Sequence, residues 1–270
     1  MKNIGLIGFG NMGEAFAAGL AGQGGVKFGV AEKAAARLAA AREKFGAEDF
    51  TGRPGDLLDF ADFTIIAVKP QDAASVLEKI APYSRDKKFA AIVAGKTLDF
   101  YLSRLQTPYV ARFMPSLAAM YQKAVVGVSF PPAPEGREAE FADFRSQALE
   151  AAAAAGFALE IPESLMPVIT AVSGSGLAFV FAFINALALG GVKTGLGYAE
   201  AAGLALRVTE GACEVLRRTG EAPSSLITKV ASPAGTTIAG LQALEEAAFT
   251  AAVMRAVEEA ASRAEELEGV

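Results

Sequence analysis

The sequence lacks histidine and tryptophan altogether, and it has one cysteine. A single thiol excludes an internal disulfide framework and fits a reducing compartment. Because no Cys/His cluster exists, we expect no zinc site and predict no metal. Histidine is also the usual proton shuttle of dehydrogenases that act on alcohols or ketones, so its absence points away from that chemistry. Reduction of an imine does not require such a proton donor, since the imine nitrogen can arrive already protonated.

A strong charge of one sign and a long membrane-spanning run are also missing. The net charge of -5 gives no general attraction to nucleic acid or to an anionic membrane. No signal peptide is visible, because glycines interrupt the first apolar run. The most apolar stretch, Leu177 to Val192, falls short of the roughly 20 residues that span a bilayer. We therefore expect a cytoplasmic protein without nucleic-acid or membrane partners, and a helix buried on all sides, as between subunits.

A glycine-rich turn directly after the first strand is the most informative motif. Residues 4–7 read as a buried strand, Gly8 to Gly13 spell G-x-G-x-x-G, and residues 14–20 continue with the apolar spacing of a helix. In that context the motif predicts dinucleotide binding. Gly8 allows the tight turn, Gly10 lets the backbone approach a pyrophosphate, and Gly13 lets helix and strand pack closely. An ordinary turn between strand and helix is the less favoured alternative.

Short β-rich runs alternate with helical patterns up to about residue 161. Further strands are expected at 26–31, 63–68, 89–94 and 109–113, with helices at 34–45, 71–80 and 98–105 between them. Edge strands at 123–130 and 158–161 are expected around a helix at 138–155. This alternation predicts βαβ units and a parallel sheet.

Beyond Pro162 the strand-like alternation disappears, and helices are expected at 163–171, 175–193, 198–219, 223–230 and 236–268, the last broken near Ala248. The predicted fold is thus an α/β Rossmann-type domain at residues 1–161, followed by an all-α dimerisation domain at residues 162–270. Several of these helices carry apolar residues on more than one face. So small a bundle cannot cover them from within, which predicts a core shared with a second copy.

Three further stretches lie where predicted strands end. They are Ala67-Val68-Lys69-Pro70, the pair Ala94-Gly95, and the segment that contains Met114. Ligands of an open α/β sheet bind at that edge, so Lys69 is placed to touch a cofactor, and the small residues leave room for a nicotinamide ring. On spacing alone, a solvated Lys69 before a helix-starting Pro70 is equally favoured.

Two hydroxyl-rich stretches stand before predicted helices in the second domain. Ser173-Gly174-Ser175-Gly176 precedes the apolar helix, and Ser232-Pro233-Ala234-Gly235-Thr236-Thr237 precedes a later one. Serine and threonine cap helices routinely, and that reading stays open. A helix N-terminus also offers free N–H donors to a carboxylate, which makes both stretches candidate substrate contacts.

Together these stretches resemble the Δ1-pyrroline-5-carboxylate reductases, and the match runs nearly the whole length of the chain. The glycine loop is shared with many dehydrogenases, whereas the two hydroxyl-rich stretches in this order are more specific to the family. The resemblance implies NAD(P)H-dependent reduction of the C=N bond of 1-pyrroline-5-carboxylate to L-proline, the last step of proline biosynthesis. It also implies a homodimer that shares its helical domain, often within a larger ring of dimers.

The resemblance assigns roles to individual residues. Thr237 is the expected catalytic residue, and the expected contacts of the cyclic imino acid substrate are Ser175, Ser232, Gly235 and Thr236. The residues expected to bind NADP or NAD are Gly8, Phe9, Gly10, Asn11, Met12, Gly13, Glu32, Lys33, Ala67, Val68, Lys69, Pro70, Ala94, Gly95 and Met114. One departure is Ser116-Leu117-Ala118, which stands where the family has Asn-Thr-Pro after Met-Pro.

Two alternatives remain open beside this reading. A β-hydroxyacid dehydrogenase shares the two-domain plan, but the positions of its proton-donating lysine and its asparagine hold Val180 and Ile184 here. A non-catalytic nucleotide-binding paralogue is favoured by the departure after Pro115 and opposed by the retained Ser232 and Thr237.

The preference between the two nicotinamide cofactors depends on the end of the second strand. Glu32 lies 19 residues after Gly13, where an acid can bond a ribose 2′-OH and repel a 2′-phosphate. Lys33 and Arg53 lie close enough to offset it. We therefore expect NADH and NADPH to be used without a strong preference.

Overall fold

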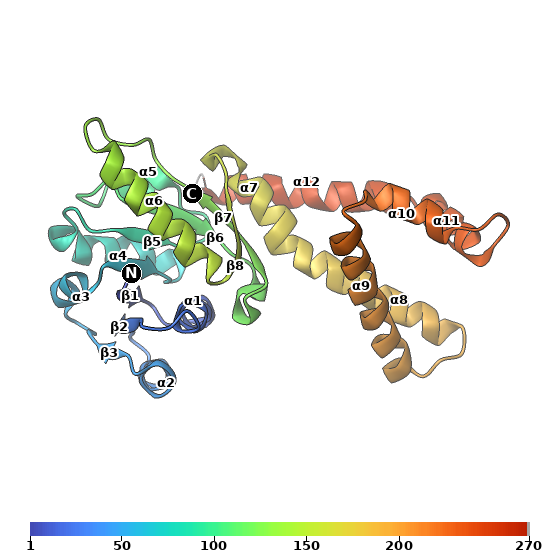
Figure 1. The fold of residues 1–270 in the computed structure, drawn as a ribbon, viewed down its shortest axis with the longest axis horizontal. Helices are drawn as coiled ribbons and strands as arrows, with labels where there is room; N and C mark the ends of the chain where they lie inside the picture. Colours follow the sequence, from blue (N-terminus) through green and yellow to red (C-terminus); the bar gives the residue numbers. More distant parts are fainter. Residues whose placement is uncertain (269–270) are drawn as a thin grey trace. The chain divides into compact units, whose positions relative to one another are not determined.

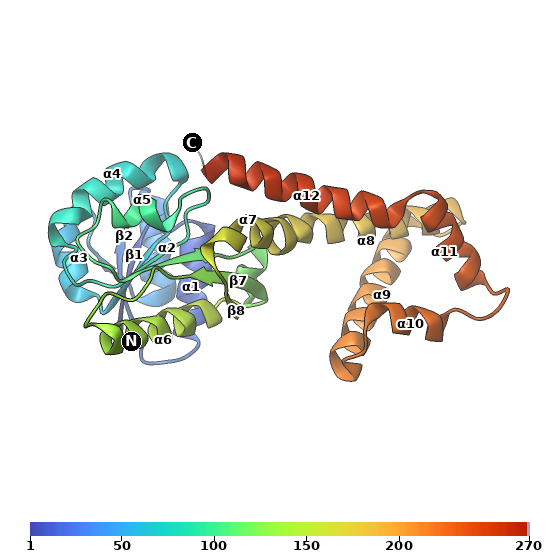
Figure 2. The ribbon, with the colours of Figure 1, turned by 90° about the horizontal axis from the view of Figure 1, so that it is seen from above.

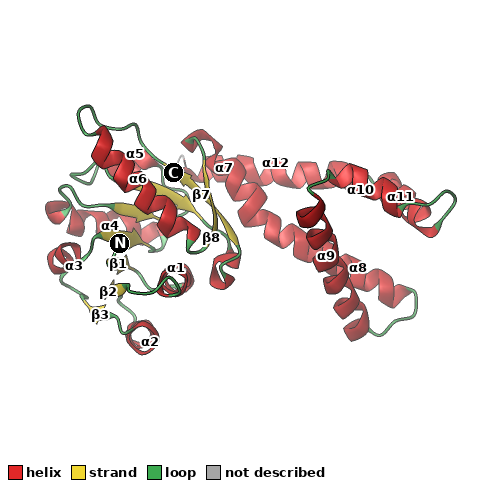
Figure 3. Cartoon of the chain, viewed as in Figure 1, coloured by secondary structure: helices red, strands yellow, loops and turns green. Residues whose placement is uncertain are grey.

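The computed structural model describes residues 1–268, which divide into two compact units. Unit 1 contains Met1–Ser175 and also the chain from Ala260 onward, whereas unit 2 is Gly176–Glu259. Strands are confined to unit 1, as Figure 3 shows. The expected fold class, a parallel-sheet domain followed by a helical one, is confirmed.

Within residues 1–268, eight strands form one sheet in the order β3-β2-β1-β4-β5-β6-β7-β8. The first six run parallel, β7 is antiparallel to β6, and β8 is parallel to β7. The strands are β1 (Asn3–Ile7), β2 (Lys27–Ala31), β3 (Glu48–Asp49), β4 (Phe63–Ile66), β5 (Phe89–Ala91), β6 (Val110–Met114), β7 (Ala124–Ser129) and β8 (Gly156–Glu160).

Helices cover both faces of this sheet (Figures 1 and 2). One apolar cluster holds residues of α1 (Asn11–Ala21), α2 (Ala35–Phe45) and α6 (Glu138–Ala153). The other holds residues of α3 (Pro54–Phe60), α4 (Pro70–Ile80) and α5 (Leu98–Leu102). The sheet is therefore buried on both sides, as parallel sheets usually are.

The register of the sheet fixes where the strand ends lie. Ile7 of β1 pairs with Ala31 of β2 on one side and with Ile66 of β4 on the other. The next residues of the three strands are Gly8, Glu32 and Ala67, so these stand side by side at the carboxyl edge. This is the point where the strand order reverses, and ligands of open α/β sheets bind there.

The sequence analysis missed β3 and α3. A strand of two residues is too short to show alternation, and the seven-residue α3 begins at Pro54 without a recognisable apolar period. Both elements matter because residues 50–52, which follow β3, and Pro54 and Leu57 of α3 line the carboxyl-edge cavity described below.

A continuous helical run, Glu163–Lys193, follows the sheet. It consists of the short turns η3 (Glu163–Leu165) and α7 (Met166–Ile169), the π-helical η4 (Thr170–Ser175) and α8 (Gly176–Lys193). By length and composition this run can cross a membrane, so the expectation that the apolar stretch is too short to span was wrong. The expected gap between two helices here is bridged by the π-helical turn.

Unit 2 consists of α8, α9 (Tyr198–Thr219), α10 (Pro223–Val230), α11 (Thr236–Glu246) and the first part of α12 (Phe249–Glu268). The break near Ala248 is confirmed, since that residue has φ +55° between α11 and α12. Within the described chain, the buried apolar cluster of this unit comprises Ala188, Ala201 and Ala205. Large apolar side chains such as Phe181 and Leu204 are more than half exposed, at 55% and 52%. One copy of this unit therefore has almost no core of its own.

The boundary between the two compact units falls after Ser175, later than the expected domain boundary at residue 161. The physical reason is that residues 163–175 pack against the sheet. A Cβ on Gly127 of β7 would lie 2.8 Å from Cγ2 of Ile169, so no side chain separates α7 from that strand. The division at 161 between nucleotide and dimerisation functions stays a prediction.

Candidate functional site

The glycine loop after β1 has a geometry that only glycine allows at two positions. Gly8 has φ +90°, and a Cβ there would lie 2.6 Å from the carbonyl oxygen of Ala67. A Cβ on Gly13 would lie 2.5 Å from the carbonyl oxygen of Gly8. Since real Cβ contacts are not that short, β1, β4 and α1 approach one another this closely only without side chains. The structure thus agrees with the turn and packing roles expected for these two glycines.

The start of α1 is open to an anion. Its N-cap is Gly10, and no side chain caps the helix. The first N–H groups of a helix have no partner within it, and the positive end of the helix dipole lies there. The residues at this position, Asn11 and Met12, therefore present donors suited to a phosphate.

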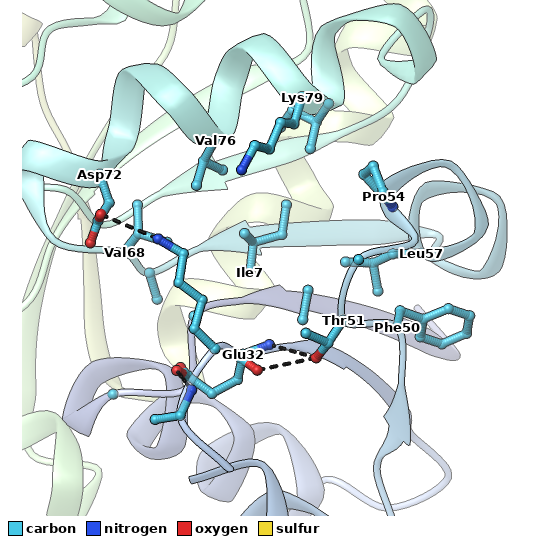
Figure 4. A pocket seen from close by; sticks show the side chains of 18 of the residues that line it. Ile7, Glu32, Phe50, Thr51, Pro54, Leu57, Val68, Asp72, Val76 and Lys79 are labelled. Carbon is cyan, nitrogen blue, oxygen red and sulfur yellow. Dashed lines mark hydrogen bonds and ion pairs between the residues drawn. The ribbon is translucent and has the colours of Figure 1, made fainter.

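A cavity of about 450 Å³ lies at the carboxyl ends of β1, β2 and β4 (Figure 4). Charged and apolar residues line it together. The charged residues are Glu32, Lys33, Arg37, Lys69, Asp72 and Lys79. The apolar residues include Ile7, Phe50, Pro54, Leu57, Val68, Val76 and Ile80. With more basic than acidic groups and many apolar side chains in its lining, the cavity fits a phosphate-bearing ligand that has a flat ring.

The Glu32 carboxylate is held in place by the backbone. It accepts the N–H of Phe9 at 2.7 Å and the N–H of Ala34 at 2.8 Å, one on each oxygen. Thr51 adds a second anchor, because it accepts the N–H of Glu32 at 3.2 Å and donates to its carbonyl at 3.1 Å. Glu32 therefore stands as a fixed acceptor at the mouth of the cavity.

Of the two basic residues that the sequence suggested near Glu32, the structure places Lys33 at the cavity but not Arg53. Lys33 pairs with Asp72 of α4 at 3.4 Å and lines the cavity (Figure 4). Arg53 instead binds the carbonyl of Asp49 and pairs with Asp56, and it does not line the cavity. Arg37 takes its place: a Cβ on Gly10 would lie 2.7 Å from its Nη1 atom.

The structure brings seven of the expected cofactor residues into this one cavity: Gly8, Gly10, Glu32, Lys33, Ala67, Val68 and Lys69. Phe9, Asn11, Met12 and Gly13 belong to the adjoining loop and helix start. Pro70 begins α4 and is not among the lining residues of the cavity. Ala94, Gly95 and Met114 lie further along the same edge of the sheet, after β5 and at the end of β6, and are not part of the cavity.

The ends of β5 and β6 meet other parts of unit 1. The Cε atom of Met114 lies 3.6 Å from the Cβ position of Gly174 in the π-helical turn. Gly95 has φ +69°, and the carbonyl oxygen of Leu267 lies 3.0 Å from its Cβ position. Two motifs that the sequence separates, Met114 and Ser173–Ser175, are therefore neighbours.

Ser175 does not stand at a helix start. The expectation that free N–H groups of a helix N-terminus lie there was therefore wrong. Ser175 ends the π-helical turn of a continuous run, in which the Ser173 hydroxyl donates to the carbonyl of Ile169 at 2.8 Å. Backbone N–H groups inside a helical run are used within it. Only the side chain of Ser175 remains available as a contact, although π-helical turns are frequent at functional sites.

The Ser232–Thr237 segment of unit 2 does form a helix start. Gly235 is the N-cap of α11 and no side chain caps the helix. A Cβ on Gly235 would lie 2.2 Å from the Oγ atom of Ser232, so the Ser232 hydroxyl stands directly beside the start of α11. Thr236 and Thr237 are the first two helical residues, and their N–H groups are unclaimed by a cap. The arrangement suits a carboxylate.

Several cavity residues escaped the sequence analysis, among them Arg37, Thr51, Leu57, Val76 and Lys79. Part of the signal was present, since Asp72, Val76 and Lys79 recur at intervals of four and three residues and so share one face of α4. Thr51 and Leu57 follow β3, which was itself missed. In residues 1–268 no group of three or more Cys, Asp or Glu side chains is placed to hold a metal ion.

Comparisons with known proteins fit this geometry. A family model described as pyrroline-5-carboxylate reductase dimerisation matches residues 163–267, and one described as NADP oxidoreductase, coenzyme F420-dependent, matches residues 3–95. The pyrroline-5-carboxylate reductase of Methanosarcina acetivorans is 38% identical, with 98% of both chains covered. That of Aquifex aeolicus is 34% identical, with 98% of this chain and 97% of the relative covered.

Solved structures agree. A pyrroline-5-carboxylate reductase from Coxiella burnetii superposes with a TM-score of 0.89 at 25% identity, covering 98% of each chain. The Plasmodium falciparum pyrroline carboxylate reductase, solved with NADP bound, gives 0.83 at 25% identity, again covering 98% of each chain.

Proposed function

The chain belongs to the pyrroline-5-carboxylate reductase family, and from that premise we propose that its glycine-loop cavity and the start of α11 divide the binding of cofactor and substrate between them. The family's activity is the NAD(P)H-dependent reduction of the C=N bond of 1-pyrroline-5-carboxylate, which forms proline. The observation that carries this activity to the chain is 38% identity over 98% of both chains with a reductase of that name.

The cofactor fits the residues that are present. When bound, the reduced nicotinamide supplies the hydride. Gly8 to Gly13 hold the pyrophosphate through the open start of α1, and Glu32 accepts from a ribose hydroxyl. Lys33, Ala67, Val68 and Lys69 surround the adenosine half, and we assign Pro70 to the same half because it begins α4 directly after Lys69. Ala94, Gly95 and Met114 flank the nicotinamide half, where their small or flexible side chains leave room for a ring.

The substrate carboxylate is assigned to the start of α11. The N–H group of Thr236 and the hydroxyl of Ser232 offer donors, and the helix dipole favours an anion there. The N–H of Gly235 donates to the carbonyl of Ser232 at 3.1 Å, so we assign Gly235 to the substrate contact through the close turn that it forms before α11. Ser175 contributes a hydroxyl from the π-helical turn.

Thr237 is assigned to the ring nitrogen. A hydroxyl is a poor acid at neutral pH, so its role is to orient an iminium that arrives already protonated. As hydride reaches the ring carbon, the C=N electron pair moves onto the nitrogen, which keeps its proton and becomes the amine of proline. No further proton donor is needed, which suits a chain without histidine.

Replacing Thr237 with alanine tests the assignment. Loss of one positioned donor should lower kcat/KM by about 10- to 1000-fold, or ~1.4–4 kcal/mol. Because Gly235 caps α11 and no side-chain cap bond is formed, the melting temperature should stay near that of the wild type. Activity is followed as NAD(P)H oxidation with pyrroline-5-carboxylate, or in reverse with thiazolidine-4-carboxylate.

Thr228→Ala is the matched control. Thr228 lies in α10 of the same unit, where its exposed hydroxyl donates to the carbonyl of Ser225 at 2.8 Å. It should leave kcat/KM unchanged. A Thr237→Ala protein with native kcat/KM and a lowered melting point would leave Thr237 a structural residue and the assignment unsupported.

The assembly and location are further parts of the proposal. The helical part carries the family's dimerisation domain. We assign the exposed apolar faces of unit 2 to a second copy of the chain, which supports a homodimer in the cytoplasm rather than a membrane-spanning helix. In this view residues 1–161 bind the dinucleotide, and residues 162–270 dimerise and hold the substrate.

A further inference from the structure

Arg112 of β6 is a charged residue inside the α/β unit. Its side chain is charged and yet only 4% exposed, because β6 lies inside the sheet. Its Nη1 atom lies 3.0 Å from Oε1 of Glu163, and its Nη2 atom donates to Oε1 of Glu268. The same Oε1 atom of Glu163 accepts the N–H of Leu98 at 2.7 Å, at the start of α5.

The three charged residues come from separate parts of the chain. Arg112 is in a strand, Glu163 is the first residue of the helical run, and Glu268 is the last residue of α12. The chain leaves unit 1 at Ser175 and re-enters it at Ala260. The two glutamates therefore mark the outgoing and the returning connection, and one guanidinium holds both.

Burial of a charged group inside a core has a large desolvation cost, and apolar side chains of the same size often give equal or greater stability. A buried ionic cluster is thus weak evidence of a stabilising role. Where such groups are useful, they fix one arrangement among several. Arginine suits this use because its planar fork can bind two carboxylates at once.

The residues assigned to the nicotinamide half of the site lie within a few residues of members of the cluster along the chain. Met114 lies two residues after Arg112 and touches the Gly174 position of the π-helical turn. Gly95 lies three residues before Leu98, and the carbonyl of Leu267 closes over it. The β5–α5 loop, the end of β6 and the π-helical turn are thus each linked to the cluster, directly or through an adjoining residue.

Tyr101 gives an independent sign that this region is constrained. Its hydroxyl is buried and has no hydrogen-bond partner in the part of the chain that the structure describes. Burial raises the pKa of Tyr101, and the nearby Arg112 charge opposes that effect. Most buried hydroxyls in proteins have a hydrogen-bond partner, so an unpaired one beside the ion cluster marks this region as unusual.

We propose that Arg112 is a positioning residue for hydride transfer: by holding Glu163 and Glu268, it fixes the Gly95 loop, Met114 and the Ser173–Ser175 turn relative to one another. It acts through these groups and touches neither cofactor nor substrate. The proposal rests on the function proposed above. It places the control of nicotinamide alignment in a buried ion cluster, away from the glycine loop that binds the other half of the cofactor.

The test is Arg112→Lys, which keeps the charge but loses the fork. Misalignment should lower kcat by about 10-fold or more, because small displacements of reacting groups are costly. The primary deuterium isotope effect on kcat, measured with NAD(P)H labelled at the transferred position, should rise as hydride transfer becomes rate-limiting. The Kd of NAD(P)H, from its fluorescence, should stay within about twofold. If Arg112 only stabilised the fold, the isotope effect would stay unchanged, and kcat would not fall while the Kd of NAD(P)H stays constant.

Arg145→Lys is the matched control, because Arg145 of α6 forms an exposed ion pair at 2.6 Å with Glu160, the last residue of β8. It should change none of the three measurements. Native kcat and isotope effect in a folded Arg112→Lys protein would overturn the proposal. If that variant fails to fold, Glu268→Gln takes its place with the same readouts and the same criterion. A wild-type chain that does not reduce pyrroline-5-carboxylate would refute the proposed function itself, which is a different result.

Discussion

Gly8 offers the sharpest test of how the glycine loop works, because two effects meet at one residue. Its φ of +90° is a region that side-chain-bearing residues rarely adopt. An added Cβ would also lie 2.6 Å from the backbone oxygen of Ala67, which cannot rotate away. We therefore expect Gly8→Ala to damage both stability and cofactor binding.

The magnitude follows from adding the two effects. Forcing an alanine into the left-handed region costs roughly 1–2 kcal/mol. Overpacking in a closely packed region adds typically ~1–3 kcal/mol. Gly8→Ala should thus lower the free energy of unfolding by about 2–5 kcal/mol. To relieve the contact, the loop must move away from β4, which displaces the start of α1, and the Kd of NAD(P)H should rise about 10-fold or more.

Gly46→Ala separates the two effects. Gly46 is the C-cap of α2 with φ +62°, and nothing lies within 4 Å of its Cβ position. It carries the backbone strain without the contact, so it should lose only about 1–2 kcal/mol and leave cofactor binding unchanged. Both variants are unfolded in urea without cofactor at one protein concentration, since the stability of an oligomer depends on concentration. Equal losses in the two variants, or a native Kd in Gly8→Ala, would refute the contact argument.

Three further predictions concern the cofactor, the assembly and acid stability. Despite the fixed Glu32, the kcat/KM values for NADH and NADPH should differ by less than about 100-fold, or ~2.7 kcal/mol, because Lys33 and Arg37 stand beside it; a larger ratio in either direction would show that the acid or the bases dominate. Light scattering at low micromolar concentration should show a dimer or a ring of dimers, whereas a fully active 27.8 kDa species would contradict the shared core. The Asp62 carboxylate accepts the N–H groups of Lys2 and Asn3 at 2.9 and 3.0 Å. Burial raises the pKa of Asp62, but these two bonds, together with the positive charges of the N-terminus and Lys2, outweigh burial and hold the pKa below its usual value. That stabilisation is present above the unfolded pKa and is lost as the pH falls through the folded pKa. Asp62→Asn should therefore destabilise the protein at neutral pH, and the difference from wild type in urea denaturation should shrink as the pH falls below the usual aspartate pKa of about 3.9. A difference independent of pH would count against the carboxylate.

The fold could be predicted where each element carries its own local signal. The strands around Gly8 and the helix from Tyr198 to Thr219 agree with the sequence because apolar spacing and flanking glycines mark their limits. β3 and the π-helical turn were missed for opposite reasons. β3 is too short to show a period, and at Ser173-Gly174-Ser175 small polar residues resemble a helix start although the run continues through them.

The candidate site was predictable at the level of motifs and less so at the level of neighbours. Residues at strand ends, such as Gly8, Glu32 and Ala67, are brought together by parallel register, which a sequence implies directly. The placement of Arg37 over Gly10 depends on side-chain reach across two elements, and the link from Arg112 to Glu268 spans 156 residues. No local pattern encodes such contacts. For this reason the sequence analysis named Arg53 as the arginine near Glu32, whereas Arg37 occupies that place in the structure.

The returning segment has a consequence for how the protein is made. From the end of β8 at Glu160 to Glu268 there are 108 residues, which a ribosome adds in roughly 5–20 s. During that interval the sheet is complete in sequence, but the last turns of α12 have not emerged, and Arg112 lacks one of its two carboxylates. Until then the Arg112 guanidinium can pair with Glu163 but not with Glu268. The α/β unit therefore depends on residues that are synthesised after the whole helical unit. A domain that looks autonomous along the first 175 residues is finished only by the final segment of the chain.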